Sequence, residues 1–214
     1  MQIMPSTRIV PSLAGWCCQR GRALVLGAVV FASATVALTA SGAEQFEVET
    51  SRSGDRIEVR ARANIRAALP VVWGTLVDYE NLPEFIPGLK RSRIIARNGA
   101  TTTVEQSGEA RFLFLAVPIN VTVESTERPP VIEVRRVSGT LRHLQGRYET
   151  EVSADPAHVQ LRWIGSIAPE SDLPLWVGEV LVRHLIEQQF RGMVREIERR
   201  EAARRAAATP AAGK

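Results

Sequence analysis

The stretch SDLPLWVGEVLVRHLIEQQFRGMVREIERREAARR, residues 171–205, decides the fold of this chain. Apolar residues recur along it at spacings of three and four, which predicts one face of an α-helix. These residues are Val182, Ile186, Phe190, Met193 and Ile197. Charged residues fall on the opposite side, namely Arg191, Arg195, Glu198 and Arg199. A helix of this length would span roughly 45–50 Å, enough to cross a whole small sheet.

The two ends of this helix carry different signals. Ser171 or Asp172 can cap its start, and Pro174 sits in the first turn, where a missing N–H costs nothing. In the first half, residues 175–186, apolar side chains surround the axis, so we expect this half to be covered on more than one side. The helix should end near Arg205, leaving residues 206–214 as a disordered tail.

Composition bounds the size and the partners of the protein. A chain of 214 residues, less a leader, makes one domain with a full core. The formal net charge of +4 is unevenly placed, because residues 1–43 hold three arginines and no acid, and the chain from Arg183 onward holds eight Lys or Arg and four Glu. This basic end suits transient contact with a membrane surface, or it is simply a solvated helix face. No basic strip is interleaved with aromatic residues, so nucleic-acid binding is not expected.

The N-terminal segment, residues 1–43, has the three parts of a secretory signal peptide. Residues 1–22 are basic, residues 23–40 form an uncharged run, and Ser41-Gly42-Ala43 places small residues before a cut at Glu44. The alternative is an uncleaved anchor in the inner membrane. Either reading places the domain, residues 44–205, outside the cytoplasm, as expected for a periplasmic protein.

The two cysteines support the same division of the chain. Cys17 and Cys18 precede the uncharged run, so they would be lost with the leader. The mature domain would then have no disulfide, no catalytic thiol and no cysteine ligand for a metal.

Alternating apolar residues predict antiparallel strands between the leader and the long helix. The clearest strand is 56–65, with Ile57, Val59, Ala61, Ala63 and Ile65 on one face. Further strands are expected at 46–50, 92–97, 101–109, 112–123, 131–137, 144–152 and 159–165, and short helices at 69–79 and 81–85. Asn98-Gly99 is a hairpin signal, and Pro118 belongs at an edge or a bulge.

This order of elements predicts an α+β fold. A sheet with one apolar face must cover that face, and the helix at 171–205 is the only element long enough to do so. We therefore expect a curved antiparallel sheet wrapped around the C-terminal helix. Such a sheet does not close tightly on a single helix, so a cavity is expected between them, with the loop 85–87 near its mouth.

Several stretches resemble the START-like, helix-grip superfamily, and most closely its polyketide cyclase/dehydrase and lipid-transport group with the coenzyme Q-binding members. The resemblance covers about residues 56–200. It rests on ANIRAALPVVW at 63–73, VDYENLPEFIP at 77–87, VEQSG at 104–108, LQGRY at 144–148 and VREIERR at 194–200. It implies the helix-grip fold and an apolar ligand in the cavity. Tyr148 stands where the resemblance leads us to expect a tryptophan.

No catalytic constellation emerges from the sequence. His143, His158 and His184 are not at metal-ligand spacing, and no phosphate-cradling glycine loop occurs, so neither a metal nor a cofactor is expected. The carboxylates Asp78, Glu80 and Glu84 cluster around the short helices. A carboxylate of raised pKa at a cavity mouth could act as a general base, but helix capping and surface charge explain them more simply.

The candidate ligand-binding residues follow from the phase of each element. Gln106 alternates in step with Val104 and Ala110, so its amide should point inward and find a partner in the protein or in a ligand. The full set, from the loop, the inward strand faces and the helix stripe, is Phe85, Ile86, Gln106, Phe112, Phe114, Tyr148, Trp163, Val182, Ile186, Gln189, Phe190 and Met193.

Three functions remain open on this basis. The leading hypothesis is a non-catalytic carrier or sensor of a hydrophobic small molecule, namely a lipid, a fatty acyl chain or an isoprenoid such as a quinone. The second is a cyclase or dehydratase acting on a polyketide-like substrate. The third is an interaction module whose cavity is filled by its own bulky side chains. The sequence carries no signal for an oligomeric state.

Overall fold

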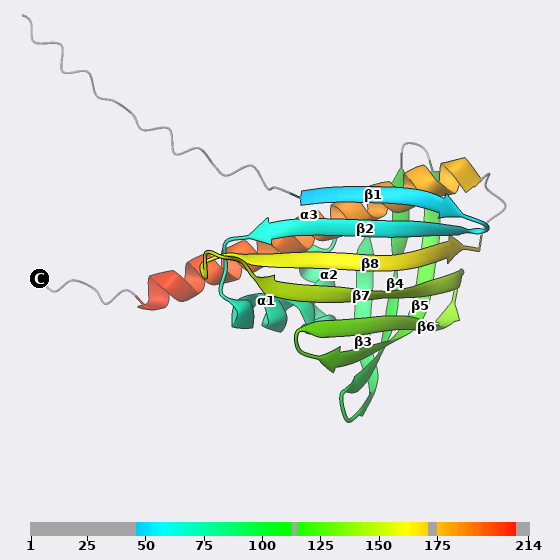
Figure 1. The fold of residues 1–214 in the computed structure, drawn as a ribbon. Coiled ribbons are helices and arrows are strands. Elements are labelled where there is room, and N and C mark those ends of the chain that lie inside the picture. Colours follow the sequence, from blue (N-terminus) through cyan, green and yellow to red (C-terminus); the bar gives the residue numbers. More distant parts are fainter. Residues whose placement is uncertain (1–45, 113–114, 171–174, 209–214) are drawn as a thin grey trace, which may run out of the picture. The chain divides into compact units, whose positions relative to one another are not determined.

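The computed structural model describes residues 46–112, 115–170 and 175–208. Within them one sheet of eight strands is accompanied by one long helix and three short ones (Figure 1). The strands are β1 (Phe46–Ser53), β2 (Arg56–Ile65), β3 (Leu89–Asn98), β4 (Thr101–Phe112), β5 (Leu115–Arg128), β6 (Val131–Gly139), β7 (Leu141–Val152) and β8 (Val159–Pro169). The helices are α1 (Leu69–Leu76), the single 3₁₀ turn η1 (Tyr79–Asn81), α2 (Leu82–Phe85) and α3 (Leu175–Ala208).

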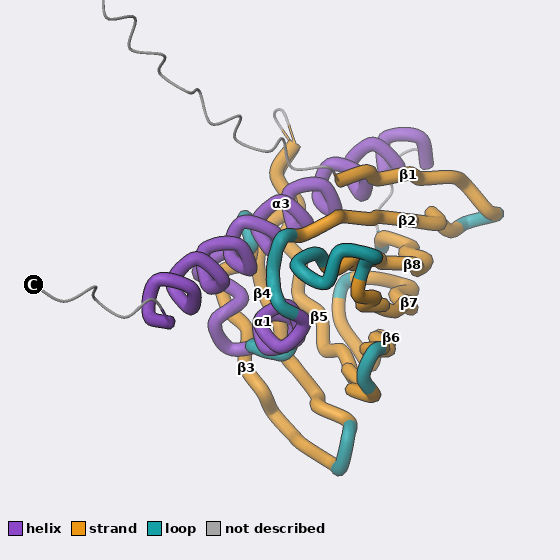
Figure 2. Tube along the Cα trace, turned by 60° about the vertical axis from the view of Figure 1, so that its left-hand side comes forward, coloured by secondary structure: helices purple, strands orange, loops and turns teal. Residues whose placement is uncertain are grey.

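The sheet is antiparallel throughout, in the order β1-β2-β8-β7-β6-β5-β4-β3. All neighbours but one are consecutive in the chain, and the exception, β2 with β8, joins the two ends of the domain. α3 packs against β1 and β2 near one edge of the sheet and also reaches β4 near the other. A flat sheet cannot bring both edges to one helix, so the sheet curves around α3, as Figure 2 shows. This confirms the α+β helix-grip fold expected from the sequence.

β2 illustrates how the sequence pattern becomes a wall of the core. Its five apolar residues from Ile57 to Ile65 are all buried, and the polar residues between them are all exposed. Period-two alternation of this kind places one face of a strand on the core and the other in water. The expected strand bounds, 56–65, are those of the structure.

The other strands are longer than their patterns suggested, and the strand expected at 112–123 is wrong at its start, because Phe112 ends β4 and β5 begins at Leu115. β4 and β5 form a hairpin of paired residues from Thr101–Thr126 to Phe112–Leu115. β6 pairs with β5 only from Val121 onward, so Pro118 lies where β5 has β4 as its only partner among the described strands. The expectation of an edge position for Pro118 is therefore met, because the missing N–H leaves no ladder hydrogen bond unmade.

The apolar stripe of α3 is buried as predicted, since Val182, Ile186, Phe190, Met193 and Ile197 are all at most 8% exposed. The expectation that the first half of this helix is covered on more than one side does not hold at two of its apolar residues. Trp176 is 62% and Val180 44% exposed, so one side of this segment is left uncovered by the described elements.

The ends of α3 bear on two further expectations. The proposed caps Ser171 and Asp172, with Pro174, lie outside the described residues. At the other end the helix continues to Ala208, so the segment 206–208, expected to be a disordered tail, is helical. Of the helices in the described ranges, none has both the length and the apolar character needed to cross a membrane.

Candidate functional site: a cavity between sheet and helix

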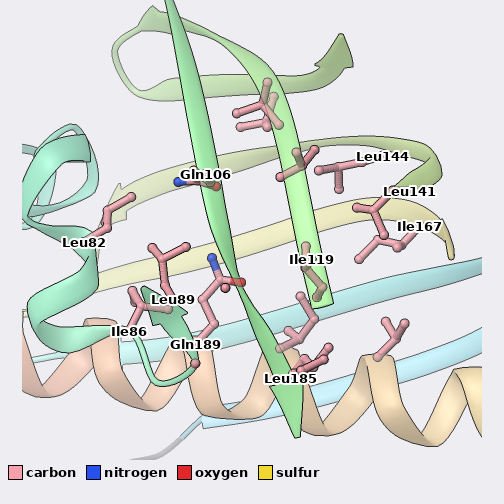
Figure 3. Close-up of a pocket in the computed structure, with 18 of the residues that line it drawn as sticks. Leu82, Ile86, Leu89, Gln106, Ile119, Leu141, Leu144, Ile167, Leu185 and Gln189 are labelled. Carbon is pink, nitrogen blue, oxygen red and sulfur yellow. The ribbon is translucent and has the colours of Figure 1, made fainter. Parts of the chain in front are cut away.

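A cavity of about 500 Å³ lies between the inner face of the sheet and α3. Its wall draws on β4, β5, β6, β7 and β8, on the short helices and on one side of α3 (Figure 3). About half of the lining residues are leucine, isoleucine or valine, so the interior is largely hydrophobic. The space remains because the side chains of the curved sheet and those of α3 do not meet in its middle.

Eight of the twelve candidate residues line this cavity. They are Ile86, Gln106, Tyr148, Trp163, Val182, Ile186, Gln189 and Met193. They come from α3, β4, β7, β8 and the residue after α2, which are far apart in the sequence. That these side chains contact a ligand remains a prediction.

Phe85 and Phe190 lie outside the lining. α2 is a single turn that ends at Phe85, and the chain then becomes extended at Ile86, so these consecutive side chains diverge. Ile86 enters the cavity, whereas the ring of Phe85 packs against Arg200, whose guanidinium carbon lies 5.6 Å from the ring centroid. Phe190 is 2% exposed and stacks behind Tyr148 at 6.4 Å between ring centroids. Phe112 ends β4 but its side chain, like the whole of Phe114, is outside what the structure describes.

Trp163 and Tyr148 form an aromatic wall on β8 and β7. Their ring centroids are 4.6 Å apart. The indole lies across Gly146 and Gly165, because a Cβ at Gly146 would be 2.6 Å from Trp163 Cζ2 and one at Gly165 would be 2.9 Å from the same atom. Two facing glycines are therefore what admits a tryptophan on this part of the sheet.

A few polar atoms interrupt the hydrophobic lining. Gln189 Nε2 donates to Tyr148 Oη at 3.4 Å, and Gln106 Nε2 donates to Ser92 Oγ at 3.4 Å. Burial raises the pKa of Tyr148 to about 12, so its hydroxyl is neutral at physiological pH. Tyr79 donates its hydroxyl proton to Glu127 Oε1 at 3.1 Å, and burial raises its pKa as well. The polar groups that the cavity offers are thus mainly uncharged amides and hydroxyls.

The carboxylates singled out in the sequence do not face the cavity. Asp78, Glu80 and Glu84 are absent from its lining. Asp78 Oδ2 instead accepts from the Arg200 guanidinium at 2.7 Å, and Oδ1 accepts from Asn81 Nδ2 at 2.9 Å. The simpler interpretation, structural and surface charge, fits these contacts.

One carboxylate at the cavity wall is held ionised. Glu109 Oε2 accepts from Arg111 at 3.0 Å and from Lys90 Nζ at 2.9 Å. These hydrogen bonds, that from Arg111 first, lower the pKa of Glu109. A general base in this kind of site needs the opposite shift, toward neutrality. Glu109 is therefore poorly suited to take a proton from a substrate.

Sequence reasoning missed many lining residues, some of which it could have found. Leu144 and Ile167 share the inward phase of Tyr148 and Trp163, so simple alternation identifies them. Leu141 also lines the cavity, although it is an odd number of residues from Leu144. A bulge between Leu141 and His143 returns it to the inner face, and no local pattern predicts that bulge.

The loop after α2 closes on α3 through a glycine. A Cβ on Gly192 would clash with the carbonyl oxygen of Phe85 and lie 3.0 Å from Pro87 Cδ. Beside this contact lies a smaller hollow of about 230 Å³, lined by Phe85, Pro87 and polar residues of α3. The loop 85–87 therefore borders the main cavity on one side and the helix on the other.

Comparisons with known proteins agree with this architecture. The family model described as polyketide cyclase / dehydrase and lipid transport matches residues 56–200. No curated protein matches the chain in sequence.

Solved structures with similar folds include proteins of both kinds named in that description. The Zhui aromatase/cyclase from a Streptomyces species is 14% identical, with a TM-score of 0.58 over 74% of this chain and 99% of the other. A STAR-related lipid transfer protein from Xanthomonas axonopodis is 14% identical, with a TM-score of 0.60 over 74% and 96%. A START superfamily protein from Mycobacterium smegmatis is 15% identical, with a TM-score of 0.53 over 68% and 97%.

At these identities the structural likenesses establish the fold, while the family model spans most of the described domain. The curved sheet, the long closing helix and the internal cavity are consistent with both. This chain belongs to the polyketide cyclase/dehydrase and lipid transport family.

Proposed function

We propose that this protein is a non-catalytic carrier of a hydrophobic small molecule, such as a lipid, a fatty acyl chain or an isoprenoid. The observation that supports this best is the cavity of about 500 Å³ with its largely aliphatic lining. Sites for small molecules commonly measure about 300–1,000 Å³, so the volume is that of a ligand site rather than a packing defect. Transfer of apolar ligand surface from water into such a cavity contributes about 25 cal/mol per Å².

A cyclase or dehydratase is the second candidate, because the Streptomyces neighbour is an aromatase/cyclase. That function requires an acid or a base placed against the substrate. Among the described lining residues, Glu109 is fixed in two ion pairs, and Tyr148 has a raised pKa. Both groups are therefore poorly suited to acid or base catalysis, which favours a carrier over an enzyme. The resemblance of the sequence to the coenzyme Q-binding members adds a quinone to the candidate cargoes.

The site of action that we propose is outside the cytoplasm. The support is the leader in residues 1–43, with its basic start, its uncharged run and its small residues before Glu44. A carrier there would take its cargo from a membrane, and the basic residues near the end of α3 would favour brief contact with anionic lipid. In this proposal the leader directs export, the cavity holds the cargo, and the basic end of α3 contacts the membrane surface.

Native mass spectrometry on the full chain, purified without detergent from cells that make it, tests the carrier function. We expect a discrete added mass that extraction with organic solvent removes and identifies as a hydrophobic molecule. A protein that is empty as isolated, and that also fails to take up added lipids and quinones, would contradict the proposal. Polyketide-like substrates would then be the next compounds to test.

A further inference from the structure

We propose that the cavity selects uncharged ligands, each with an apolar body and one neutral carbonyl or hydroxyl group that binds beside Gln106, Gln189 and Tyr148. This inference rests on the proposed carrier function and names the class of its cargo. Neutral lipids, esters, alcohols and quinone-like molecules should therefore bind, whereas free fatty acids and the charged head groups of phospholipids should not.

The first argument is the charge of the wall. Among the described residues that line the cavity there is no lysine, arginine or histidine. The two cations that contact the lining residue Glu109, namely Lys90 and Arg111, are already engaged in ion pairs with it. An ionised carboxylate or phosphate that entered this space would lose its hydration without gaining a counter-charge, which is strongly unfavourable.

A cationic ligand is disfavoured for a related reason. Glu109 and Glu170 are the only carboxylates among the described lining residues. The negative charge of Glu109 is balanced by its two ion pairs, and Glu170 is exposed just beyond the end of β8. Neither provides a buried, unpaired negative charge in the interior. The cavity therefore discriminates against ligands of either sign.

The second argument is the spare hydrogen-bonding capacity of the two amides. Figure 3 shows Gln106 on β4 and Gln189 on α3, set among leucine and isoleucine side chains. Their hydrogen bonds to Ser92 and Tyr148, both 3.4 Å, are longer than the usual range of about 2.7–3.2 Å. A primary amide has two N–H donors and a carbonyl acceptor, so one long bond leaves most of each group available.

Together these features give a largely apolar cavity a small number of uncharged polar groups with spare hydrogen-bonding capacity. Gln189 and Tyr148 are linked to each other, and both are half-buried in the same lining as Gln106. A ligand carbonyl can accept from the amide N–H groups, and a ligand hydroxyl can donate to an amide carbonyl. The wall offers no counter-charge in the interior, so it disfavours ligands that carry the same chain on an ionised head group.

The test compares ligands of one chain length that differ only in head group. The full chain is titrated with dodecane, dodecanol, methyl dodecanoate, dodecanoate at pH 8 and dodecyltrimethylammonium, and binding is followed by native mass spectrometry. We expect dodecanol and methyl dodecanoate to bind, and the two ions to bind at least roughly tenfold more weakly, since no counter-charge replaces their lost hydration.

Matched variants test whether Gln106 and Gln189 bind the polar group of the ligand. Gln106→Leu and Gln189→Leu should each weaken methyl dodecanoate binding by up to about tenfold, the factor that one net hydrogen bond supplies. Binding of dodecane should not weaken in these variants, which also shows that the cavity is intact. Gln145→Leu, on the exposed face of β7, is the control and should bind both ligands as the unaltered protein does.

The outcomes separate this inference from the function on which it rests. Dodecanoate binding as tightly as methyl dodecanoate, or Gln106→Leu and Gln189→Leu both binding the ester unchanged, would overturn the inference and leave the carrier function standing. If none of the compounds binds, dodecane included, the carrier function itself fails and the inference fails with it.

Discussion

Single glycines determine how closely the walls of this domain approach each other. Gly192 lies on the face of α3 that meets the loop after α2, where a side chain would clash with the Phe85 carbonyl oxygen. Gly74, in α1, is also helical, but a Cβ there would meet no atom within 4 Å. The same residue type therefore has a packing role at one site and none at the other.

Gly192→Ala should destabilise the protein, by about 1–3 kcal/mol if the loop yields as overpacked cores do. Gly74→Ala should leave stability unchanged or raise it by up to about 1 kcal/mol, because alanine favours a helix over glycine. Thermal unfolding of the two variants side by side measures the difference. Equal midpoints for both would mean that α3 and the loop 85–87 are not in the contact described here.

At the scale of elements, two buried glutamates connect the C-terminal part of α3 to the residues on either side of α1. Glu196 and Glu201 are only 8% and 2% exposed. Glu196 accepts hydrogen bonds from Arg199 and Arg200, and Arg200 also donates to Asp78, which lies just after α1.

Glu201 makes the second connection. It binds Arg204 and Arg205, and it also accepts from the backbone N–H of Ala68, the residue before α1, which has no side-chain cap of its own. α3 thus provides an acceptor for the backbone just before α1 from a distant part of the chain. These contacts hold the short helices against the long one.

These contacts predict a loss of stability in acid. Hydrogen bonds from Arg199 first and Arg200 lower the pKa of Glu196 from its ordinary 4.5 to about 2, and those from Arg204 first lower that of Glu201 to about 2. A depressed pKa in the folded state stabilises the fold above the unfolded value and stops doing so as the pH falls through the folded one. The contribution should therefore be complete above pH 4.5 and disappear toward pH 2.

Glu201→Gln tests this assignment. At neutral pH the variant should be less stable by about 1–3 kcal/mol, the cost of weakening a buried charged hydrogen-bond group. The gap between the variant and the unaltered protein should narrow as the pH is lowered from 4.5 to 2, measured by urea unfolding at each pH. Glu133→Gln, at an exposed position on β6, should show no such gap. A difference that is constant with pH would assign the acid response to other groups.

At the scale of the whole domain, the cavity exists because the sheet curves around one helix and contacts it mainly near the two edges of the sheet. α3 contacts the sheet at β1 and β2 and again at β4, and the strands between these contacts leave the space unfilled. Ile186 and Met193 line the cavity from the helix, whereas Val180 is on the exposed side of the same helix. Function at this scale depends on empty volume rather than on any single group.

Filling that volume should abolish ligand uptake while the domain stays folded. Ile186→Trp and Met193→Trp each add a large ring where the wall faces free space, so the cost of overpacking should be modest. Val180→Trp is the control and should bind as the unaltered protein does. Circular dichroism checks the fold, and native mass spectrometry with the neutral ligands above measures uptake. Ligand binding that survives both cavity variants would place the site elsewhere.

Most of the strands and the helix stripe could be predicted from the sequence, because each is a local periodicity. The alternation in β2 and the spacing of Val182, Ile186 and Met193 name the buried faces before any packing is known. The candidate site was predictable at Gln106 and Tyr148, which sit in such a pattern, although Phe190 shares the helix stripe and packs against Tyr148 outside the cavity lining. It was not predictable at Leu141, which a bulge turns inward, or at Phe85, which a one-turn helix turns outward.

The sequence by itself determined which elements form, which face of each is apolar, and the α+β class that their order implies. Only the tertiary structure decided that β2 joins β8, that Glu201 binds the backbone just before α1, and that the inward faces stay far enough apart to enclose about 500 Å³. The physical reason is that hydrophobic periodicity reports the direction of a side chain relative to its own backbone. The distance between two facing walls depends on sheet curvature and on close approaches such as that at Gly192, which involve residues far apart in the chain.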